Sequence, residues 1–387
     1  MGENMKIKKG IGIICICATA VLWSGCFSAA AKSNQEGLAK YEAGEFAEAC
    51  RLFGRAISQN DTETSYYVNL GMAEIQMGEY DWAKEHFQQA LRLEEDNMLA
   101  YRGLGLACLA SEEYDLSIEY LNQAIDCGDR SVGKLDYDII GYRAEAQTKA
   151  GQLKEAEASY TQLIDLEVQP TQHYIKRGSV RLKDNRVEAA LEDFWAAAAK
   201  EPNNFAVYLE IYKTLAQFQV GESGETFLYQ ALEIPVKSHE DRVMRGRVLM
   251  LLGDRQEAME LFRQAAEGGF SDASLLLARC YEDLGQYSEA EMIYQQLLAQ
   301  DTGNARVYNQ LAICKQKQGQ FEKALTMVRQ GISIGDPAVL PDLYWNEAMI
   351  YEAMGEYGFA YEKLEEYGQK FSFDEEAGKE AAFLKTR

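Results

Sequence analysis

A repeat of about 34 residues organises most of this 387-residue chain and constrains its fold more than any other feature of the sequence. A chain that repeats on this scale forms one supersecondary unit per period, and neighbouring units stack because a single unit cannot bury its own hydrophobic face. The usual estimate of one domain per ~150 residues therefore does not apply here. The clearest marker of the repeat is a glycine, found at Gly44, Gly78, Gly151, Gly253, Gly285, Gly319 and Gly355.

Two further positions recur after this glycine, a small residue and, four places later, a large one. Residues four apart lie on the same face of a helix, and small residues let two helices approach closely while a large one fills the space between them. The small residues are Ala49, Ala83, Ser117, Ala156, Ala190, Gly224, Ala258, Ala290, Ala324 and Ala360. The large ones are Phe53, Phe87, Leu121, Tyr160, Phe194, Leu228, Phe262, Tyr294, Val328 and Leu364.

This pattern predicts two helices per repeat, with the recurring glycine at a positive φ in the turn between them. The chain has only five prolines, and all of them fall between repeats, where they break no helix. The pattern resembles the tetratricopeptide repeat family. The resemblance implies an all-α protein, an α-solenoid of about ten helix–turn–helix repeats that form a superhelix over residues 30–373. Residues 374–387 are then expected to form a final capping helix. The first to tenth repeats start near residues 30, 64, 98, 137, 171, 205, 239, 271, 305 and 341.

The N-terminus has the pattern of a bacterial export signal. Three lysines precede an apolar run from Ile11 to Trp23, which is shorter than the ~20 residues of a transmembrane helix. Ser24, Gly25 and Cys26 follow and resemble the lipobox of bacterial lipoproteins, although Trp23 stands where that family prefers leucine. The resemblance implies cleavage of a signal peptide, residues 1–25, before a lipidated Cys26, with residues 26–33 as a short tether. An ordinary secretion signal and an uncleaved anchor are the alternatives.

The sequence offers no catalytic or cofactor site, and we expect no enzyme. Its three histidines are scattered, with His86 and His239 expected on the surface, and no CxxC pair indicates a zinc or redox site. Gly103 and Gly105 begin like a dinucleotide loop, but they lie within a predicted helix. The cysteines and the tyrosines at the fourth position of the repeats are expected in the core, and the acidic residues on solvated faces. The net charge of −22 repels phosphate backbones and argues against nucleic acid as a partner.

The family resemblance implies a scaffold that binds protein or peptide partners, held by a lipid anchor at the extracytoplasmic face of a bacterial membrane, the outer membrane included where the source has one. One alternative is a subunit of an envelope secretion, pilus or outer-membrane assembly machine. A second is a glycan-binding lipoprotein, which the short loops disfavour. Fold alone does not decide between them.

A basic row marks where a partner is expected to bind. In tetratricopeptide arrays particular turns of the first helices line the concave wall, and here those turns carry Lys176, Lys183, Lys213, Arg247 and Arg279. The last three hold the same position in consecutive repeats. Such a row is suited to acidic side chains or a free terminal carboxylate. Pairing of these cations with neighbouring glutamates is the alternative interpretation.

Overall fold

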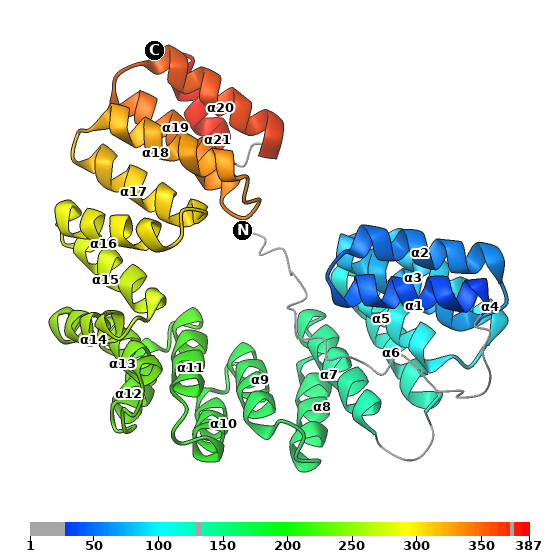
Figure 1. Cartoon of the computed structure of the whole chain (residues 1–387). Helices are drawn as coiled ribbons and strands as arrows, with labels where there is room; N and C mark the ends of the chain where they lie inside the picture. Colours follow the sequence, from blue (N-terminus) through cyan, green and yellow to red (C-terminus); the bar gives the residue numbers. More distant parts are fainter. Residues whose placement is uncertain (1–27, 129–132, 372–374) are drawn as a thin grey trace. The chain divides into compact units, whose positions relative to one another are not determined.

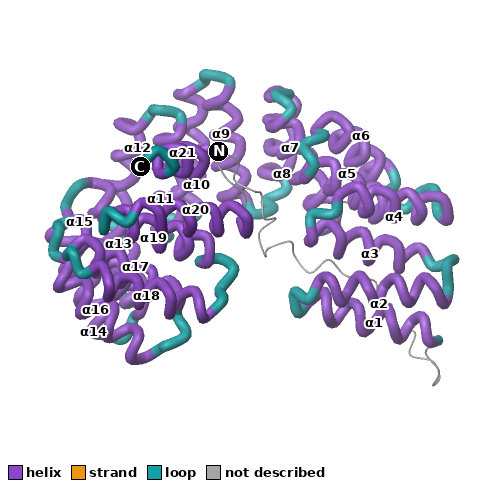
Figure 2. The backbone as a smooth tube through the Cα atoms, turned by 90° about the horizontal axis from the view of Figure 1, so that it is seen from above, coloured by secondary structure: helices purple, strands orange, loops and turns teal. Residues whose placement is uncertain are grey.

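The computed structural model describes residues 28–128, 133–371 and 375–387, and the regular secondary structure of these residues is entirely helical (Figure 1, Figure 2). The prediction of an all-α chain built from consecutive helical pairs is confirmed. The expected signal peptide 1–25 and Cys26 lie outside the described residues. From Ala29 on, a helix occupies the expected tether, because the side chain of Ser28 accepts a hydrogen bond from the Ala31 N–H (3.1 Å) and caps that helix.

Ten helices form an N-terminal body, which comprises the described residues up to Pro202 together with Gln217–Gln219. Each of these helices packs against the next one along the chain. They are α1 (Ala29–Glu42), α2 (Phe46–Gln59), α3 (Thr64–Met77), α4 (Tyr80–Leu93), α5 (Met98–Ala110), α6 (Tyr114–Asp126), α7 (Lys134–Lys149), α8 (Leu153–Asp165), α9 (Pro170–Lys183) and α10 (Val187–Lys200).

The remaining helices form a C-terminal body, which comprises Asn203–Ala216 and Val220–Arg387. From α12 on, each helix again packs against its successor, and α21 packs on α20. They are α11 (Phe205–Gln217), α12 (Gly221–Leu232), α13 (His239–Leu252), α14 (Arg255–Glu267), α15 (Ser271–Asp283), α16 (Tyr287–Gln300), α17 (Ala305–Lys317), α18 (Phe321–Ile334), α19 (Leu340–Ala353), α20 (Tyr357–Phe371) and α21 (Glu375–Leu384).

The turn between the two helices of a repeat requires a left-handed residue. All seven recurring glycines have a positive φ, between 71° and 91°, as the sequence predicted. In three repeats without the glycine, Glu112, Asn185 and Gln219 take the same conformation at the equivalent position, with φ of 63°, 57° and 61°. The turn geometry is therefore kept even where a side chain must bear its steric cost.

The recurring small and large residues form the core, which confirms the packing inferred from them. All twenty are buried, and Phe87 is an example with no exposed surface. Its ring lies between α3 and α5. A Cβ added at Gly71 would be 2.7 Å from that ring, and one added at Gly103 would be 2.3 Å from it. Gly103 is therefore a packing glycine inside a helix, in agreement with the rejection of a dinucleotide loop.

Candidate protein-binding surface

Lys213, Arg247 and Arg279 occupy equivalent positions in the first helices of three consecutive repeats of the C-terminal body. Each lies near the middle of its helix, in α11, α13 and α15, and each side chain is exposed. Among the described residues, none of the three makes a hydrogen bond or an ion pair. We call these three residues the cation row. Their mid-helix location gives them no role at the negative end of a helix dipole.

Two other cations of the same body do have partners. Arg245, two residues before Arg247, donates to the carbonyl of Leu232, and Lys315 pairs with Glu291. Arg247 has no carboxylate within reach on its own helix, since the residues three and four places away are Val243, Met244, Met250 and Leu251. The other two members have acidic neighbours at helical spacing, Glu210 three residues before Lys213 and Glu282 three residues after Arg279. Burial raises the pKa of Glu282, and the positive charge of Arg279 acts in the opposite direction.

Lys176 and Lys183, the other two predicted binding residues, lie on α9 in the N-terminal body. Both side chains are exposed and neither makes an ion pair among the described residues. Partial burial, together with the nearby Lys149, lowers the pKa of Lys183. Lys149 and Lys183 end α7 and α9, where a cation complements the helix dipole. A structural role therefore accounts for Lys183 without any ligand.

The first helices of the N-terminal body also carry a polar cluster, but its groups satisfy one another. Arg102 is buried and donates through Nε to Asp138 (3.0 Å), and its guanidinium lies 5.4 Å from the ring centre of Tyr142. Burial raises the pKa of Tyr142 to about 12. Asn69 donates to Asn34 (2.9 Å). This region offers a partner few free polar groups.

Ion pairs between neighbouring helices include two acidic residues that we expected on solvated faces. That expectation is wrong for Asp193 and Glu347, which are both about 2% exposed. Asp193 accepts hydrogen bonds from Arg177 (2.6 Å and 3.1 Å) and forms an ion pair with Arg181 (3.1 Å). The recurring core positions gave no sign of these pairs, since the partners lie 12 or more residues apart.

Two of these inter-repeat pairs repeat the same geometry. Glu157 accepts from Arg181 (2.8 Å), and Glu291 accepts from Lys315; each acid precedes its cation by 24 residues. In both cases the acid lies on a second helix and the cation on the first helix of the next repeat. The pairs therefore join α8 to α9 and α16 to α17 at equivalent points.

The burial of two histidines and of most recurring tyrosines differs from what the sequence led us to expect. His86 and His239 are half-buried rather than exposed. His86 Nδ1 lies 2.8 Å from a carboxylate oxygen of Glu74, and this hydrogen bond raises its pKa. Of the recurring tyrosines only Tyr208 is fully buried; the others, Tyr67, Tyr101, Tyr174, Tyr308 and Tyr344, keep some exposed surface.

The cysteines match the expected role as core residues in part. Cys108, Cys280 and Cys314 are buried, whereas Cys50 and Cys127 are only half-buried. All five are free thiols, and the described residues hold no group of three or more histidine, cysteine or acidic side chains suited to a metal ion.

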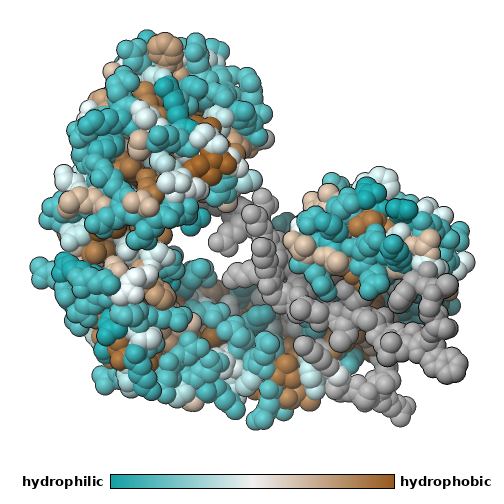
Figure 3. Space-filling view, viewed as in Figure 1, coloured by the Kyte–Doolittle hydropathy of each residue, from teal (hydrophilic) through white to brown (hydrophobic). Residues whose placement is uncertain are grey.

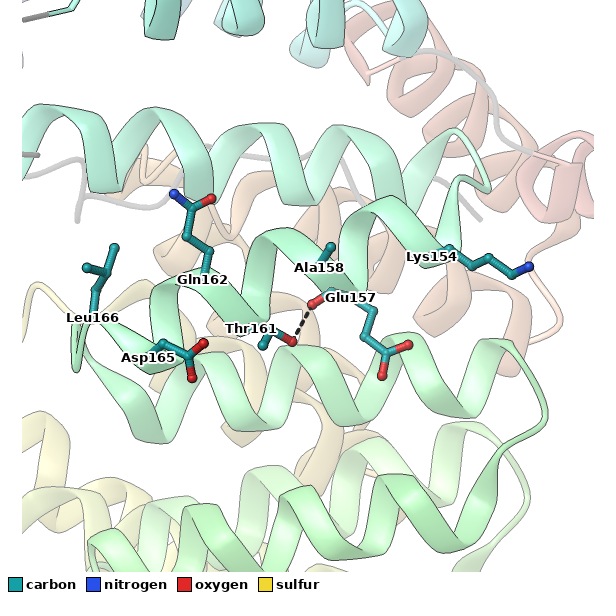
Figure 4. Close-up of a pocket in the computed structure, with 7 residues that line it drawn as sticks. All are labelled: Lys154, Glu157, Ala158, Thr161, Gln162, Asp165 and Leu166. Atoms are coloured by element: carbon teal, nitrogen blue, oxygen red, sulfur yellow. Dashed lines mark hydrogen bonds between the residues drawn. The ribbon is translucent and has the colours of Figure 1, made fainter. Parts of the chain in front are cut away.

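A shallow cavity of about 620 Å³ lies along one face of α8 (Figure 4). Glu157, its central acidic group, is already bonded to Arg181 and Arg186. The lining offers no histidine, cysteine or serine that a nucleophilic reaction would use. Its residues are Lys154, Glu157, Ala158, Thr161, Gln162, Asp165 and Leu166.

Exposed hydrophobic side chains are spread over the surface rather than gathered into one patch. Trp82, Tyr229 and Phe359 are each more than half exposed and belong to three different repeats. On the face seen in Figure 3, hydrophilic residues predominate and hydrophobic ones are scattered among them. Single exposed hydrophobic residues are ordinary on a protein surface. None of the helices in the described ranges is long and apolar enough to cross a membrane.

Comparison with known protein families finds tetratricopeptide repeats in both bodies. Residues 68–131 match one sequence model described as a tetratricopeptide repeat, and residues 249–301 and 283–338 match a second one. A curated human relative, the protein O-mannosyl-transferase TMTC1, is 23% identical over 143 residues. That match covers 35% of this chain and only 16% of the relative's length.

Solved structures with similar helical arrangements share little sequence with this chain. Yeast Tom70 is 14% identical, with a TM-score of 0.46, over 92% of this chain and 88% of its own. A tetratricopeptide repeat protein from Parabacteroides merdae is 11% identical, with a TM-score of 0.45, over 62% and 92% of the two chains. YrrB, described as a TPR protein with an unusual peptide-binding site, is 21% identical, with a TM-score of 0.37, over 47% and 91%.

Proposed function

We propose that this chain, which matches tetratricopeptide repeats over residues 68–131 and 249–338, is a lipid-anchored scaffold at the extracytoplasmic face of a bacterial membrane. A scaffold for protein–protein interactions is the function that the repeats support. The lipid anchor is our inference from Ser24, Gly25 and Cys26 behind a lysine-rich, apolar leader. We propose no enzymatic activity for it.

The cation row is the observation that carries the binding proposal. Lys213, Arg247 and Arg279 are exposed at equivalent positions of three consecutive repeats. In a chain of net charge −22 they add nothing to solubility, since a large net charge of one sign already provides it. Their charge is available for acidic groups of a partner, through charge-assisted hydrogen bonds.

Isolation of bound material tests the binding function. The full-length protein, extracted in mild detergent and purified through a C-terminal tag, is expected to carry protein partners that mass spectrometry identifies. A large set of envelope components would favour the assembly-machine subunit instead, and a co-purified glycan would favour the glycan-binding lipoprotein. Recovery of the protein with no associated material would contradict the scaffold.

Fatty-acid labelling tests the anchor. Cells fed a clickable fatty-acid analogue should label the parent protein, whereas the Cys26→Ser variant should take up no label and leave the membrane fraction. Two or three acyl chains are needed for stable attachment, because a single chain binds membranes only marginally. A Cys26→Ser protein that is still labelled would disprove lipidation at this residue.

A further inference from the structure

We propose that Arg143, on α7 of the N-terminal body, binds a carboxylate group of a ligand. The site lies outside the cation row, and it does not depend on the proposed scaffold function. Its basis is an arrangement of three interacting side chains that recurs in the fourth, fifth and tenth repeats, and that has no acidic member in the fourth.

The fifth repeat shows this arrangement with its charges compensated. Arg177, on the first helix α9, donates to the residue sixteen places later, Asp193 of the second helix α10, through Nη2 (2.6 Å) and Nε (3.1 Å). It also donates through Nη1 to Thr161 of α8 (2.9 Å), on the second helix of the preceding repeat. The central residue thus connects three successive helices and is held there by a carboxylate.

The tenth repeat has the same arrangement with the signs reversed. Glu347, on the first helix α19, accepts from Arg329 of α18 (3.0 Å), on the second helix of the preceding repeat. It also pairs with Lys363 of α20 (3.3 Å), on the second helix of its own repeat. Both Asp193 and Glu347 are buried, and each has cationic partners. A charge is tolerated in a protein interior when it is paired in this way.

Arg143 is the central residue of this arrangement in the fourth repeat, and it has only neutral partners. It donates through Nη2 to Ser159 of α8 (3.3 Å), sixteen residues later on the second helix of its own repeat. It donates through Nη1 to Asn122 of α6 (3.1 Å), on the second helix of the preceding repeat. Serine therefore stands where the fifth repeat has Asp193.

The guanidinium of Arg143 consequently carries a charge without an ion pair among the described residues. Its Nε is buried and has no hydrogen-bond partner, and each Nη uses one of its two N–H groups. Burial lowers the pKa of Arg143, and only the charge of Asp126 acts in the opposite direction. Burial acts in the same way on Arg177, but the hydrogen bond to Asp193 and neighbouring charges outweigh it and raise that pKa.

A carboxylate is the ligand group that this guanidinium lacks. Its two oxygens match paired N–H groups of an arginine, and the two hydrogen bonds are charge-assisted. Arg143 is half-buried and its partner Asn122 is exposed, so a ligand can reach the Nη atoms from the side of α6. The partly buried setting strengthens the contact, because the local dielectric constant is lower than at an exposed arginine. A water molecule would fill the hydrogen bonds but would leave the charge uncompensated.

Thermal unfolding of the full-length protein, in sodium acetate and in sodium chloride at equal concentration and neutral pH, tests the site. A ligand that binds only the folded chain raises the midpoint, so the parent should melt at a higher temperature in acetate. Arg143→Leu removes the cation, and Ser159→Asp supplies the carboxylate found in the fifth repeat. Both variants should lose the acetate-dependent shift. Arg143→Leu is expected to fold, because Leu104 and Leu277 occupy the same position in their repeats.

Two comparisons make the result specific to this site. Ser159→Asp should melt at a higher temperature than the parent in chloride, because it compensates the charge of Arg143 within the chain, and this shift would show that the variant is folded. Ser288→Asp adds the same charge at an exposed site in the first turn of α16, and it should respond to acetate like the parent. An equal acetate shift in all four proteins, or no shift in the parent, would overturn the proposal.

Recovery of partners from detergent extracts identifies the source of the carboxylate. If Arg143→Leu and Ser159→Asp both lose partners that the parent retains, the carboxylate belongs to an acidic side chain of a partner protein. If they keep those partners while the acetate shift is lost, it belongs to a small carboxylic acid. If the parent itself recovers no partner, the scaffold function fails, and the acetate shifts still decide whether Arg143 binds a carboxylate.

Discussion

Gly103→Ala should destabilise the protein, although alanine is the better helix former. An added Cβ at Gly103 would lie 2.3 Å from Cε1 and 2.4 Å from Cζ of Phe87, whereas carbon atoms in contact normally lie about 3.5–4.0 Å apart. The ring has little room to move away, because it also packs closely on Gly71 of α3, where an added Cβ would lie 2.7 Å from Cζ. Overpacking of this kind costs about 1–3 kcal/mol.

A second glycine provides the matched comparison. Gly54 lies inside α2, and an added Cβ there would meet no atom within 4 Å. Gly54→Ala should therefore show only the helix-propensity gain, about 0.5–1 kcal/mol of added stability. Since both substitutions carry the same propensity gain, the free energies of unfolding of the two variants should differ by the overpacking cost alone, about 1–3 kcal/mol.

Urea unfolding followed by circular dichroism measures both variants. The midpoint of Gly54→Ala should rise and that of Gly103→Ala should fall, with unchanged slopes. Replacing the ring in Gly103→Ala/Phe87→Leu should recover part of the loss, because the two substitutions share one contact and are not additive. If both alanine variants are stabilised to the same extent, the ring of Phe87 is not held between α3 and α5 as described.

Three further predictions concern buried charge, turn geometry and pH. Asp193→Ala should lower the free energy of unfolding by about 3 kcal/mol, because it leaves the half-buried Arg177 without its carboxylate partner, while Arg181 keeps Glu157; an unchanged urea midpoint would contradict this. Gln219→Gly should raise the thermal midpoint by relieving a left-handed φ of 61°, at about 1 kcal/mol, whereas Gln219→Ala should not. The bonded carboxylate raises the pKa of His86 in the folded state, so its stabilisation is present below about pH 6.5 and is lost as the pH rises through the folded pKa. Urea midpoints at about pH 5.5 and 8.5 should differ less in His86→Gln than in the parent.

The repeat positions were predictable because their cause is local and periodic. Ala83 and Phe87 lie four residues apart on one helix, so their spacing alone indicates the shared face and the close packing of neighbours. The turn at Gln219 was not predictable in the same way. A side chain replaces the glycine there, yet the backbone adopts the left-handed conformation of the missing glycine, and the Val220 N–H donates to the carbonyl of Leu215 (3.0 Å).

The burial and the ion pairing of charged side chains were the least predictable features of the structure. Whether a carboxylate such as Asp193 is buried depends on which cations the neighbouring helices bring to it, and these are 16 or 12 residues away in the sequence. For the same reason the sequence located the cation row but did not tell whether its members were paired. The repeat period identifies equivalent positions in the chain. Whether a charged residue at such a position forms an ion pair depends on the individual residues that the neighbouring helices place beside it.

The two inter-repeat pairs of equal geometry bear on how freely the repeats can be exchanged. Glu157 and Glu291 each require a cation 24 residues later, on the first helix of the following repeat. A shortened chain that joins the fourth repeat directly to the ninth would place Glu157 opposite Lys315 and keep the pair. Joining the fourth repeat to the sixth would place Glu157 opposite Leu215, which is fully buried, and leave the carboxylate without a cation. Deletions of a whole repeat should therefore differ in their effect on stability, according to whether the new neighbour supplies the cation that each of these glutamates pairs with.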